Sequence, residues 1–289
     1  MSRPLLLGFA EYHDQAQALA RAAGLPFAMV DVHHFPDGES LVRLPEVLPE
    51  KVIFCRSLDR PNDKLVELIL AAAEARELGA KHLTLVAPYL CYMRQDKSFH
   101  AGEAVSQRVI GGLLAQAFDA VITVDPHLHR VHTLSEALPT ADSRALCAAR
   151  PIADFLAGQL DNPLLVGPDE ESEQWVAAVA AYHGLDYVVG RKTRCGDREV
   201  TIDLEADFTH RHVVLLDDIA STGRTLEVAA LLIRPSCPAS MSALVTHALF
   251  MGSALERMLN AGLWRVWSAD SIPHESNVIP LADLLAAAL

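Results

Sequence analysis

The chain has 289 residues, of which 51% are apolar and 21% are charged. At roughly 150 residues per domain, this length predicts about two domains or one large one, and the composition excludes a mainly disordered chain. The net charge of −13 argues against broad electrostatic capture of nucleic acid or of an anionic membrane. A local cluster of cations and backbone N–H groups on such a protein can still hold the phosphate of a small ligand.

The apolar stretches are short and interrupted by charges or proline, and none approaches the roughly 18–20 residues that a membrane-spanning helix needs. Residues 1–4 lead directly into a strand-like run without a small-residue cleavage site, so we expect no signal peptide. The five cysteines lie far apart and form no C-x-x-C pair, which predicts neither a disulfide framework nor a zinc knuckle. These observations predict a cytoplasmic protein.

Strand-like and helix-like segments alternate along the first half of the chain. Strands are expected over 5–9, 52–55, 83–87 and 121–124, and helices over 14–23, 62–79 and 103–118. In the helix over 62–79, apolar residues recur at intervals of three and four. Asn62 is its expected cap and Gly79 its expected C′ glycine.

A second alternating series occupies the rest of the chain. Strands are expected over 164–166, 187–189, 200–204, 213–216 and 243–245, and helices over 173–182, 223–232 and 253–259. Continuous apolar strands between helices predict an α/β fold with mainly parallel sheets that are covered on both faces. We therefore expect two tandem domains, 1–143 and 144–273, joined within 141–150. We expect the tail, 274–289, to pack back on the first domain.

The most specific motif runs from Val213 to Thr225. An apolar strand is followed by Asp217 and Asp218, and then by the loop Ser221-Thr222-Gly223-Arg224-Thr225, which opens a helix. In such a loop, backbone N–H groups converge on an anion at the helix N-terminus, and the paired carboxylates suit ribose hydroxyls or a metal-bound ligand. The alternative is an ordinary helix cap after an acidic turn. The run resembles the phosphoribosyl diphosphate fingerprint of type I phosphoribosyltransferases.

Further segments, in the same order along the chain, resemble ribose-phosphate diphosphokinases, the enzymes that make phosphoribosyl diphosphate. They are residues 35–43, 88–97, 124–127, 167–169 and the Lys-x-Arg at 192–194. The resemblance covers nearly the whole chain. It implies two tandem type I phosphoribosyltransferase-like domains. The implied reaction moves the diphosphoryl group of Mg-ATP to the 1-hydroxyl of ribose 5-phosphate.

The same resemblance implies a role for each segment. ATP would be bound by Phe35, Asp37, Gly38, Glu39, Arg94, Gln95 and His127. Ribose 5-phosphate would be bound by Asp217, Asp218, Ser221, Thr222, Gly223, Arg224 and Thr225. Lys192 and Arg194 would be catalytic, and His127 and Asp169 would hold Mg²⁺. The resemblance also implies a homo-oligomer with the ATP site near a subunit interface, and no nucleic acid or membrane partner.

The residues are compatible with these roles but leave plainer alternatives. The pair at 37–38 is a turn signal, and Arg94 offers a planar fork to phosphate. Lys192 and Arg194, two apart in an extended segment, are expected to point to one side, beside a flexible stretch at 196–197. Each of these segments could instead be a solvated turn or loop.

Two details need a separate explanation. Asp125, His127 and His129 alternate along one face, but a zinc site there lacks a convincing third and fourth ligand. Asp169 is followed by Glu170 and Glu171, where the family has small residues. These two carboxylates either help Asp169 to bind a divalent metal or face solvent in the first turn of a helix.

Two other functions compete with diphosphokinase activity. A phosphoribosyltransferase that consumes the diphosphate would not need the segment at 35–43. A non-catalytic associated subunit would be expected to lack Lys192 or His127, and both residues are present.

Overall fold

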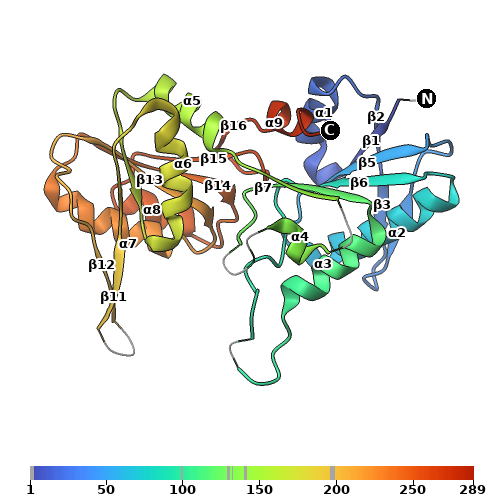
Figure 1. The fold of residues 1–289 in the computed structure, drawn as a ribbon, viewed down its shortest axis with the longest axis horizontal. Coiled ribbons are helices and arrows are strands. Elements are labelled where there is room, and N and C mark those ends of the chain that lie inside the picture. Colours follow the sequence, from blue (N-terminus) through green and yellow to red (C-terminus); the bar gives the residue numbers. More distant parts are fainter. Residues whose placement is uncertain (1–2, 99, 129–130, 132, 140–141, 196–198) are drawn as a thin grey trace. The chain divides into compact units, whose positions relative to one another are not determined.

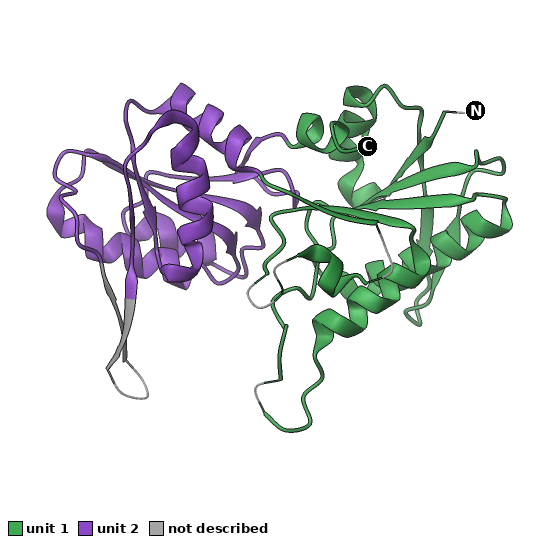
Figure 2. Ribbon diagram, in the orientation of Figure 1, with its two compact units in different colours: residues 1–147, 281–289 green, residues 148–280 purple. Residues whose placement is uncertain are grey.

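The structure is a computed structural model that describes residues 3–98, 100–128, 131, 133–139, 142–195 and 199–289, with the backbone alone at 192–195 and 199–203. It divides into two compact units, residues 1–147 with 281–289 and residues 148–280 (Figure 2). No helix in this described part combines the length and the apolar character needed to cross a bilayer.

The first unit is built on a parallel sheet with the strand order β2-β1-β5-β6-β7-β8. Its strands are β1 (Leu5–Gly8), β2 (Phe27–Met29), β5 (Lys51–Cys55), β6 (His82–Val86), β7 (Ala120–Val124) and β8 (Asp142–Leu146). Strand β7, next to the edge strand β8, is buried along its whole length, as expected for a strand covered on both faces.

Helices cover both faces of this sheet. They are α1 (His13–Ala22), which follows the short η1 (Ala10–Tyr12), α2 (Pro61–Glu77), α3 (Ser106–Ala117), α4 (Leu134–Ala137) and α9 (Ala282–Ala286). Figure 1 shows α1 and α9 on one face and α2 and α3 on the other, and α9 packs against α1. The largest core cluster joins the inner faces of α2 and α3 to the sheet.

A separate antiparallel hairpin leaves the carboxyl end of β2. It consists of β3 (Asp31–His34) and β4 (Ser40–Arg43), with His34 paired to Ser40 at the end next to the turn. Its main apolar attachments are Val32 and Val42, which are partly buried against the core.

The second unit repeats the plan with the strand order β10-β9-β13-β14-β15-β16, again parallel. Its strands are β9 (Leu164–Gly167), β10 (Tyr187–Val189), β13 (His212–Ala220), β14 (Ser240–Ala248), β15 (Arg265–Ala269) and β16 (Asn277–Ile279). A second antiparallel hairpin, β11 (Arg191–Cys195) and β12 (Glu199–Asp203), follows β10.

Two helix pairs pack on this sheet. The helical segments are α5 (Ala149–Gln159), η2 (Glu170–Ser172), α6 (Glu173–His183), α7 (Arg224–Ile233), η3 (Arg234–Ser236) and α8 (Ala254–Asn260). Helix α5 packs on α6, and α7 packs on α8. Leu226 and Ala230 of α7 share a core cluster with Val213 and Leu215 of β13, because alternate residues of a strand face the same side.

The structure corrects several sequence predictions. Residues 142–146 fall in the predicted joint between the two domains, but they form the sheet strand β8. Its residues are mostly exposed, so the sequence shows no apolar run there. Asn62 is not the cap of α2, because Arg60 takes that position and Pro61 begins the helix, where proline lacks no needed donor. Gly79 does lie in the left-handed region after α2, with a φ of 96°. Helix α3 begins at Ser106 and not at residue 103.

Candidate active site

The first predicted ATP segment forms the turn of the β3–β4 hairpin. The N–H of Phe35 donates to the Glu39 carbonyl at 2.8 Å, and the N–H of Glu39 donates to Asp37 Oδ1 at 3.1 Å. Gly38 has a φ of 94°, which a residue with a side chain would adopt only with strain. The Phe35 ring packs edge-on against His33 and stays 39% exposed. The turn therefore presents an aromatic ring and two carboxylates to solvent.

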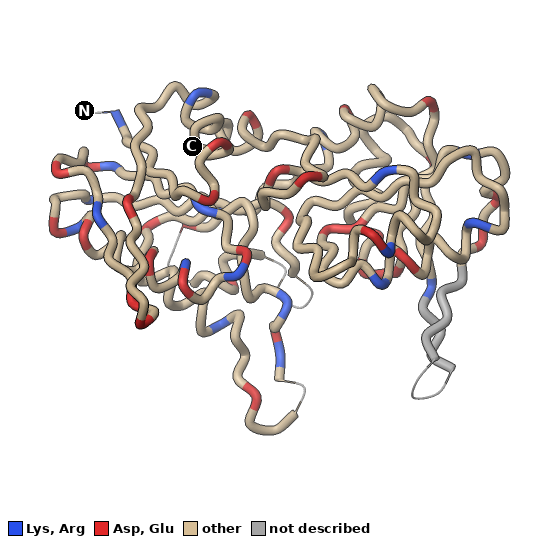
Figure 3. Tube along the Cα trace, turned by 180° about the vertical axis from the view of Figure 1, so that it is seen from behind, with Lys and Arg blue, Asp and Glu red and all other residues tan. Residues whose placement is uncertain are grey.

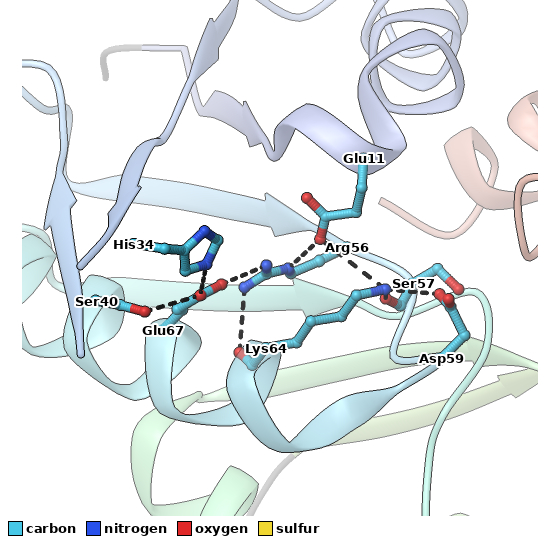
Figure 4. A network of polar contacts seen from close by, with 8 residues as sticks. All are labelled: Glu11, His34, Ser40, Arg56, Ser57, Asp59, Lys64 and Glu67. Carbon is cyan, nitrogen blue, oxygen red and sulfur yellow. Dashed lines mark hydrogen bonds and ion pairs between the residues drawn. The ribbon is translucent and has the colours of Figure 1, made fainter. Parts of the chain in front are cut away.

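The end of this hairpin next to the turn is attached to Glu67, a buried carboxylate of α2 (Figure 4). Glu67 is hydrogen-bonded to His34 Nε2 at 2.7 Å and to Ser40 Oγ at 3.1 Å, and it pairs with Arg56 at 2.5 Å. Burial acts to raise the pKa of Glu67, but the bonds from Arg56, His34 and Ser40 outweigh burial and lower it. The carboxylate is therefore held in its ionised form.

The second predicted ATP segment follows β6 and is anchored to the start of α3. The Ser106 hydroxyl donates to Gln95 Oε1, and the N–H of Gln107 donates to the Gln95 carbonyl at 3.1 Å. The Gln107 side chain donates to the Met93 carbonyl at 3.1 Å. Arg94 lies between these anchored residues and is exposed. This arrangement leaves the Arg94 guanidinium accessible to a ligand, whereas Gln95 already accepts hydrogen bonds from the first residues of α3.

His127 lies just past the carboxyl end of β7 and is half-buried. Asp125, before it, is buried and has a φ of 37°, a left-handed conformation that turns the chain sharply at the strand end. His129 lies outside the described residues. Among the residues that are described, no three His, Cys, Asp or Glu side chains are placed to hold a metal ion.

The sheet order brings some of the predicted ATP residues together and separates others. Arg94, Gln95 and His127 follow β6 and β7, which are neighbours, so their segments meet at one edge of the sheet. The hairpin leaves β2, which is three strand spacings from β6 and four from β7. At about 4.8 Å per spacing, roughly 14–19 Å separates the base of the hairpin from these segments.

The two acidic residues of the strongest motif lie within a strand and not after it. Pairing of β13 continues to Ala220, so the predicted strand, 213–216, is too short. This pairing places Asp217 beside Val245 of β14. The N–H of Asp218 donates to Asp217 Oδ1 at 3.0 Å, and Asp218 is buried. The carboxylates shorten the apolar pattern without ending the strand.

A third carboxylate adds to this acidic group. Asp169 is buried and follows β9, the neighbour of β13. Burial raises the pKa of Asp217 well above its ordinary value, and the negative charges of Asp218 and Asp169 raise it further. This negative charge would be stabilised by hydroxyl donors or by a hard cation.

The predicted sugar-phosphate loop joins β13 to α7. Gly223 is the N-cap of α7 with a φ of 69°, and a Cβ atom there would lie 3.2 Å from Met258 Sδ. Its left-handed conformation therefore favours glycine, and a larger residue would also require the Met258 side chain to shift. Ser221 and Thr225 are half-buried and Thr222 is exposed, around the N–H groups that begin the helix, of which that of Arg224 donates to Thr222 Oγ1 at 3.4 Å. This geometry is suited to an anion.

Side chains below the loop hold it in place. Arg224 Nη1 donates to Glu227 Oε1 at 2.9 Å, so its guanidinium lies along the helix. Arg257 of α8 donates to the carbonyl of Thr222 at 2.7 Å and to Ser253 Oγ at 2.8 Å. It also pairs with Glu227 at 3.4 Å. These bonds connect the loop to α7 and α8.

The unusual acidic pair after Asp169 forms a short helical turn. Glu170 and Glu171 begin η2, and both are exposed. Asp169 caps this turn by accepting from the N–H of Glu171 at 3.2 Å, and the Ser172 hydroxyl donates to the Asp169 carbonyl at 2.5 Å. The geometry favours the solvent-facing alternative for the pair.

Lys192 and Arg194 lie in β11, paired opposite Ile202 and Val200 of β12. The predicted loop cations are thus on the first strand of a hairpin, and the predicted strand at 200–204 corresponds to the second. The positions of these two side chains and residues 196–197 lie outside the described part of the structure.

Charge is distributed over both units. Figure 3 shows basic residues scattered among more numerous acidic ones, in line with 24 Lys and Arg against 37 Asp and Glu. Anion binding therefore depends on local groups such as Arg94 and the loop of α7.

Comparisons with known proteins decide the family. Residues 5–117 match the N-terminal domain of ribose phosphate pyrophosphokinase, and residues 145–277 match the phosphoribosyl transferase domain. The ribose-phosphate pyrophosphokinase of Methanopyrus kandleri is 33% identical over 99% of this chain and 98% of its own. That of Methanosarcina mazei is 34% identical over 95% and 91%. The chain belongs to the ribose-phosphate pyrophosphokinase family. Ribose-phosphate pyrophosphokinase is another name for the diphosphokinase that the motifs predict.

A solved structure agrees with this assignment at the level of the fold. Phosphoribosylpyrophosphate synthetase from Mycobacterium smegmatis superposes with a TM-score of 0.85 at 21% identity, over 99% of this chain and 97% of its own. Two tandem phosphoribosyltransferase-like domains with mainly parallel sheets are confirmed. As a ribose-phosphate pyrophosphokinase family member, the chain is an enzyme. The match to the family's N-terminal domain sets it apart from phosphoribosyltransferases with a single such domain.

Sequence reasoning missed the residues that support the site. Arg56, Glu67 and Arg257 belong to no motif, and each acts on a segment far away in sequence. A weak signal existed for Glu67, because it is the single charged residue in the otherwise apolar run 65–73.

Proposed function

We propose that this enzyme transfers the diphosphoryl group of Mg-ATP to the 1-hydroxyl of ribose 5-phosphate. The hydroxyl oxygen attacks the β-phosphorus, the bond between that phosphorus and the α-phosphate oxygen breaks, and AMP leaves. The 1-hydroxyl proton is released, and phosphoribosyl diphosphate is formed. The observation that carries the proposal is the anion-binding loop at 221–225 directly beside Asp217 and Asp218.

Ribose 5-phosphate binds in the second unit. The N–H groups at the start of α7 and the hydroxyls of Ser221, Thr222 and Thr225 donate to its phosphate, with Gly223 allowing close approach of the backbone. Asp217 and Asp218 accept hydrogen bonds from the ribose hydroxyls. The raised pKa of Asp217 supports this role, since donors at that point relieve a crowded negative charge.

ATP binds through the first unit of two protomers. Phe35 stacks on the adenine, Asp37 and Glu39 accept from its amino group, and Arg94, Gln95 and His127 contact the nucleotide and its phosphates. The separation of the hairpin from Arg94 and His127 within one chain supports a homo-oligomer that combines the two parts.

An exposed apolar surface beside the hairpin also supports oligomerisation. Val66 and Leu70 of α2 are 59% and 43% exposed, and together with Gly38, Glu39 and Ser40 they line a hollow between helix and hairpin. Apolar side chains one helical turn apart are suited to contact with a second subunit.

Carboxylate chemistry supports Mg²⁺ as the metal. Asp169 is a buried oxygen donor beside the negative charge of Asp217, which matches the preference of hard cations for oxygen. His127 and Asp169 are the residues that the proposal assigns to the metal-nucleotide complex. When bound, Mg²⁺ neutralises charge on the diphosphoryl group.

Lys192 and Arg194 are the catalytic residues of the proposal. Two cations on the β11–β12 hairpin neutralise charge that develops on the transferred group, which lowers the barrier without a covalent intermediate. Cys91 and Cys237 are free thiols, which is in keeping with a reducing cytoplasmic location.

The test is to mix the pure protein with ATP, Mg²⁺ and ribose 5-phosphate and to follow products by ³¹P NMR. We expect AMP and phosphoribosyl diphosphate in equal amounts, and no AMP when ribose 5-phosphate is omitted. A folded protein that binds ribose 5-phosphate without forming AMP would contradict the proposal and favour a regulatory subunit.

A further inference from the structure

Glu67 occupies an unusual position for a charged residue. It is 1% exposed in the middle of α2, and its partner Arg56 is 4% exposed at the end of β5. Replacing a buried ion pair by apolar groups of similar volume is often neutral or stabilising. Stability alone therefore gives little reason for a carboxylate at this position, which points to a role in fixing a particular arrangement.

The bonds of Glu67 identify that arrangement. One oxygen, Oε1, is bonded to both His34 and Ser40, the last residue of β3 and the first residue of β4 (Figure 4). These two residues are paired with each other and enclose the turn 35–39. A single buried carboxylate thus fastens both strands of the hairpin at the point where the turn begins.

The other oxygen connects this fastening to the rigid sheet. Glu67 Oε2 accepts from Arg56 Nη2, and Arg56 Nε donates to Glu11 at 2.6 Å. Arg56 Nη1 also donates to the carbonyl of Lys64 at 3.2 Å, and its guanidinium lies 4.0 Å from the centre of the Phe9 ring. Arg56 is therefore fixed from several sides, and it orients Glu67 toward the hairpin.

We infer that Glu67 is a positioning residue for ATP, which holds the β3–β4 hairpin in the orientation in which its turn binds the nucleotide. The inference rests on the proposed function, since it takes the turn 35–39 as part of the ATP site. Glu67 itself does not touch ATP. A hairpin that is released from Glu67 spends less time in the binding orientation, and its apparent affinity for ATP falls by that fraction.

The decisive variant removes the hairpin side of the network and leaves the buried ion pair intact. His34 is 65% exposed, so His34→Ala combined with Ser40→Ala removes both bonds to Glu67 without opening the core. We expect the KM for ATP to rise about three- to tenfold, which corresponds to a binding orientation populated roughly 10–30% of the time. We expect kcat and the KM for ribose 5-phosphate to stay within twofold.

Two further variants separate positioning from general damage. Ser40→Thr keeps the hydroxyl. Combined with His34→Ala, it should therefore retain part of the ATP affinity that is lost when Ser40→Ala is combined with His34→Ala. Asp119→Asn is a matched control. It removes a carboxylate that pairs at 2.6 Å with Arg76, an arginine of α2, the helix that also carries Glu67. We expect Asp119→Asn to lower stability and to leave the KM for ATP unchanged.

Glu39→Leu tests the proposed function separately, because it removes the acceptor in the turn and leaves the bonds of His34 and Ser40 to Glu67 intact. If Glu39→Leu raises the KM for ATP and the His34–Ser40 double variant does not, the positioning role is wrong and the ATP site stands. If Glu39→Leu has no effect, the turn does not bind ATP, and both assignments are wrong. Equal losses for ATP and ribose 5-phosphate in the double variant would reduce Glu67 to a structural residue.

Discussion

Arg257 donates a hydrogen bond from Nη2 to the backbone carbonyl of Thr222 over 2.7 Å. The bond joins α8 to the middle of the proposed sugar-phosphate loop, and it fixes the orientation of that carbonyl. A carbonyl oxygen that faced the ligand would repel a phosphate, whereas the N–H groups of the loop attract it.

We therefore predict that Arg257→Gln raises the KM for ribose 5-phosphate about five- to twentyfold, as expected for the loss of one charge-assisted hydrogen bond of roughly 1–2 kcal/mol. The KM for ATP should stay the same. Steady-state kinetics measure both values. Arg265→Gln serves as a control, because that arginine stacks on the exposed Trp264 at the other end of the sheet. Equal changes in the two arginine variants would contradict a specific role for Arg257.

Thr225→Val tests the loop directly. The substitution keeps the shape of the side chain and removes a hydroxyl donor to the sugar phosphate. A lost hydrogen bond to a charged group costs about 1.5–3 kcal/mol, so affinity for ribose 5-phosphate should weaken by about ten- to hundredfold. Calorimetric titration with each substrate is the measurement. A loss of the same size for ATP would show that the loop is not a dedicated sugar-phosphate site.

Lys192→Ala should act on the chemical step. A cation that acts mainly in the transition state affects kcat more than binding. We expect kcat to fall by about a hundredfold or more, within the range seen when a single electrostatic stabiliser is removed. Single-turnover kinetics at saturating substrates provide the measurement. A variant with normal kcat and only a raised KM would make Lys192 a binding residue.

The metal requirement distinguishes Asp169 from the two glutamates after it. Asp169→Asn should raise the Mg²⁺ concentration for half-maximal rate several-fold, because it removes a buried oxygen donor. Glu170→Gln combined with Glu171→Gln should leave that concentration unchanged, since both side chains are exposed. Titration of the rate with Mg²⁺ at fixed ATP separates the two. A higher requirement in the glutamate double variant would place these residues at the metal.

Asp119 gives a pH-dependent contribution to stability. Burial acts to raise the pKa of Asp119, but the Leu83 N–H, the Arg76 guanidinium and the charge of His82 together lower it below 3.8. A lowered pKa in the folded state stabilises the protein above the unfolded value, and the contribution is lost as the pH falls through the folded pKa.

Asp119→Asn should therefore lower the free energy of unfolding of the first unit by about 1 kcal/mol at pH 7, a value reduced for partial exposure. The difference from the wild type should shrink as the pH falls below about 3.8. Urea unfolding at pH 7, 5 and 3.5 measures it. Glu74→Gln, an exposed substitution on α2, the helix that carries Arg76, should show no such trend. A constant difference at every pH would contradict the assignment to Asp119.

Local signals predicted the parts of the molecule that lie close together in sequence. The strand, acidic pair, loop and helix around Asp217–Thr225 are contiguous, so chain order alone placed the sugar-phosphate site at the carboxyl edge of a parallel sheet. Strand β8 was not predicted, because an edge strand with mostly exposed residues lacks an apolar run. Strands β15 and β16 were given no element either, although β15 lies inside its sheet and four of its five residues are buried.

Long-range contacts explain what the sequence could not predict. Glu67 contacts residues 27 and 33 positions away, and Arg257 contacts a carbonyl 35 positions away. No periodicity records such pairs, since they depend on which strands become neighbours. The separation of the hairpin from Arg94 follows in the same way from the order of β2 and β6.

The helix α9 comes after the whole second unit in the chain but packs on α1 in the first. Its buried Leu285 and the preceding Leu281 complete the apolar surface of that unit. A ribosome adds about 5–20 residues per second, so the first unit waits roughly ten seconds, while the second is translated, for its last helix. During that interval the nascent chain carries an uncovered apolar face, and we expect chaperones that bind growing polypeptides to recognise it.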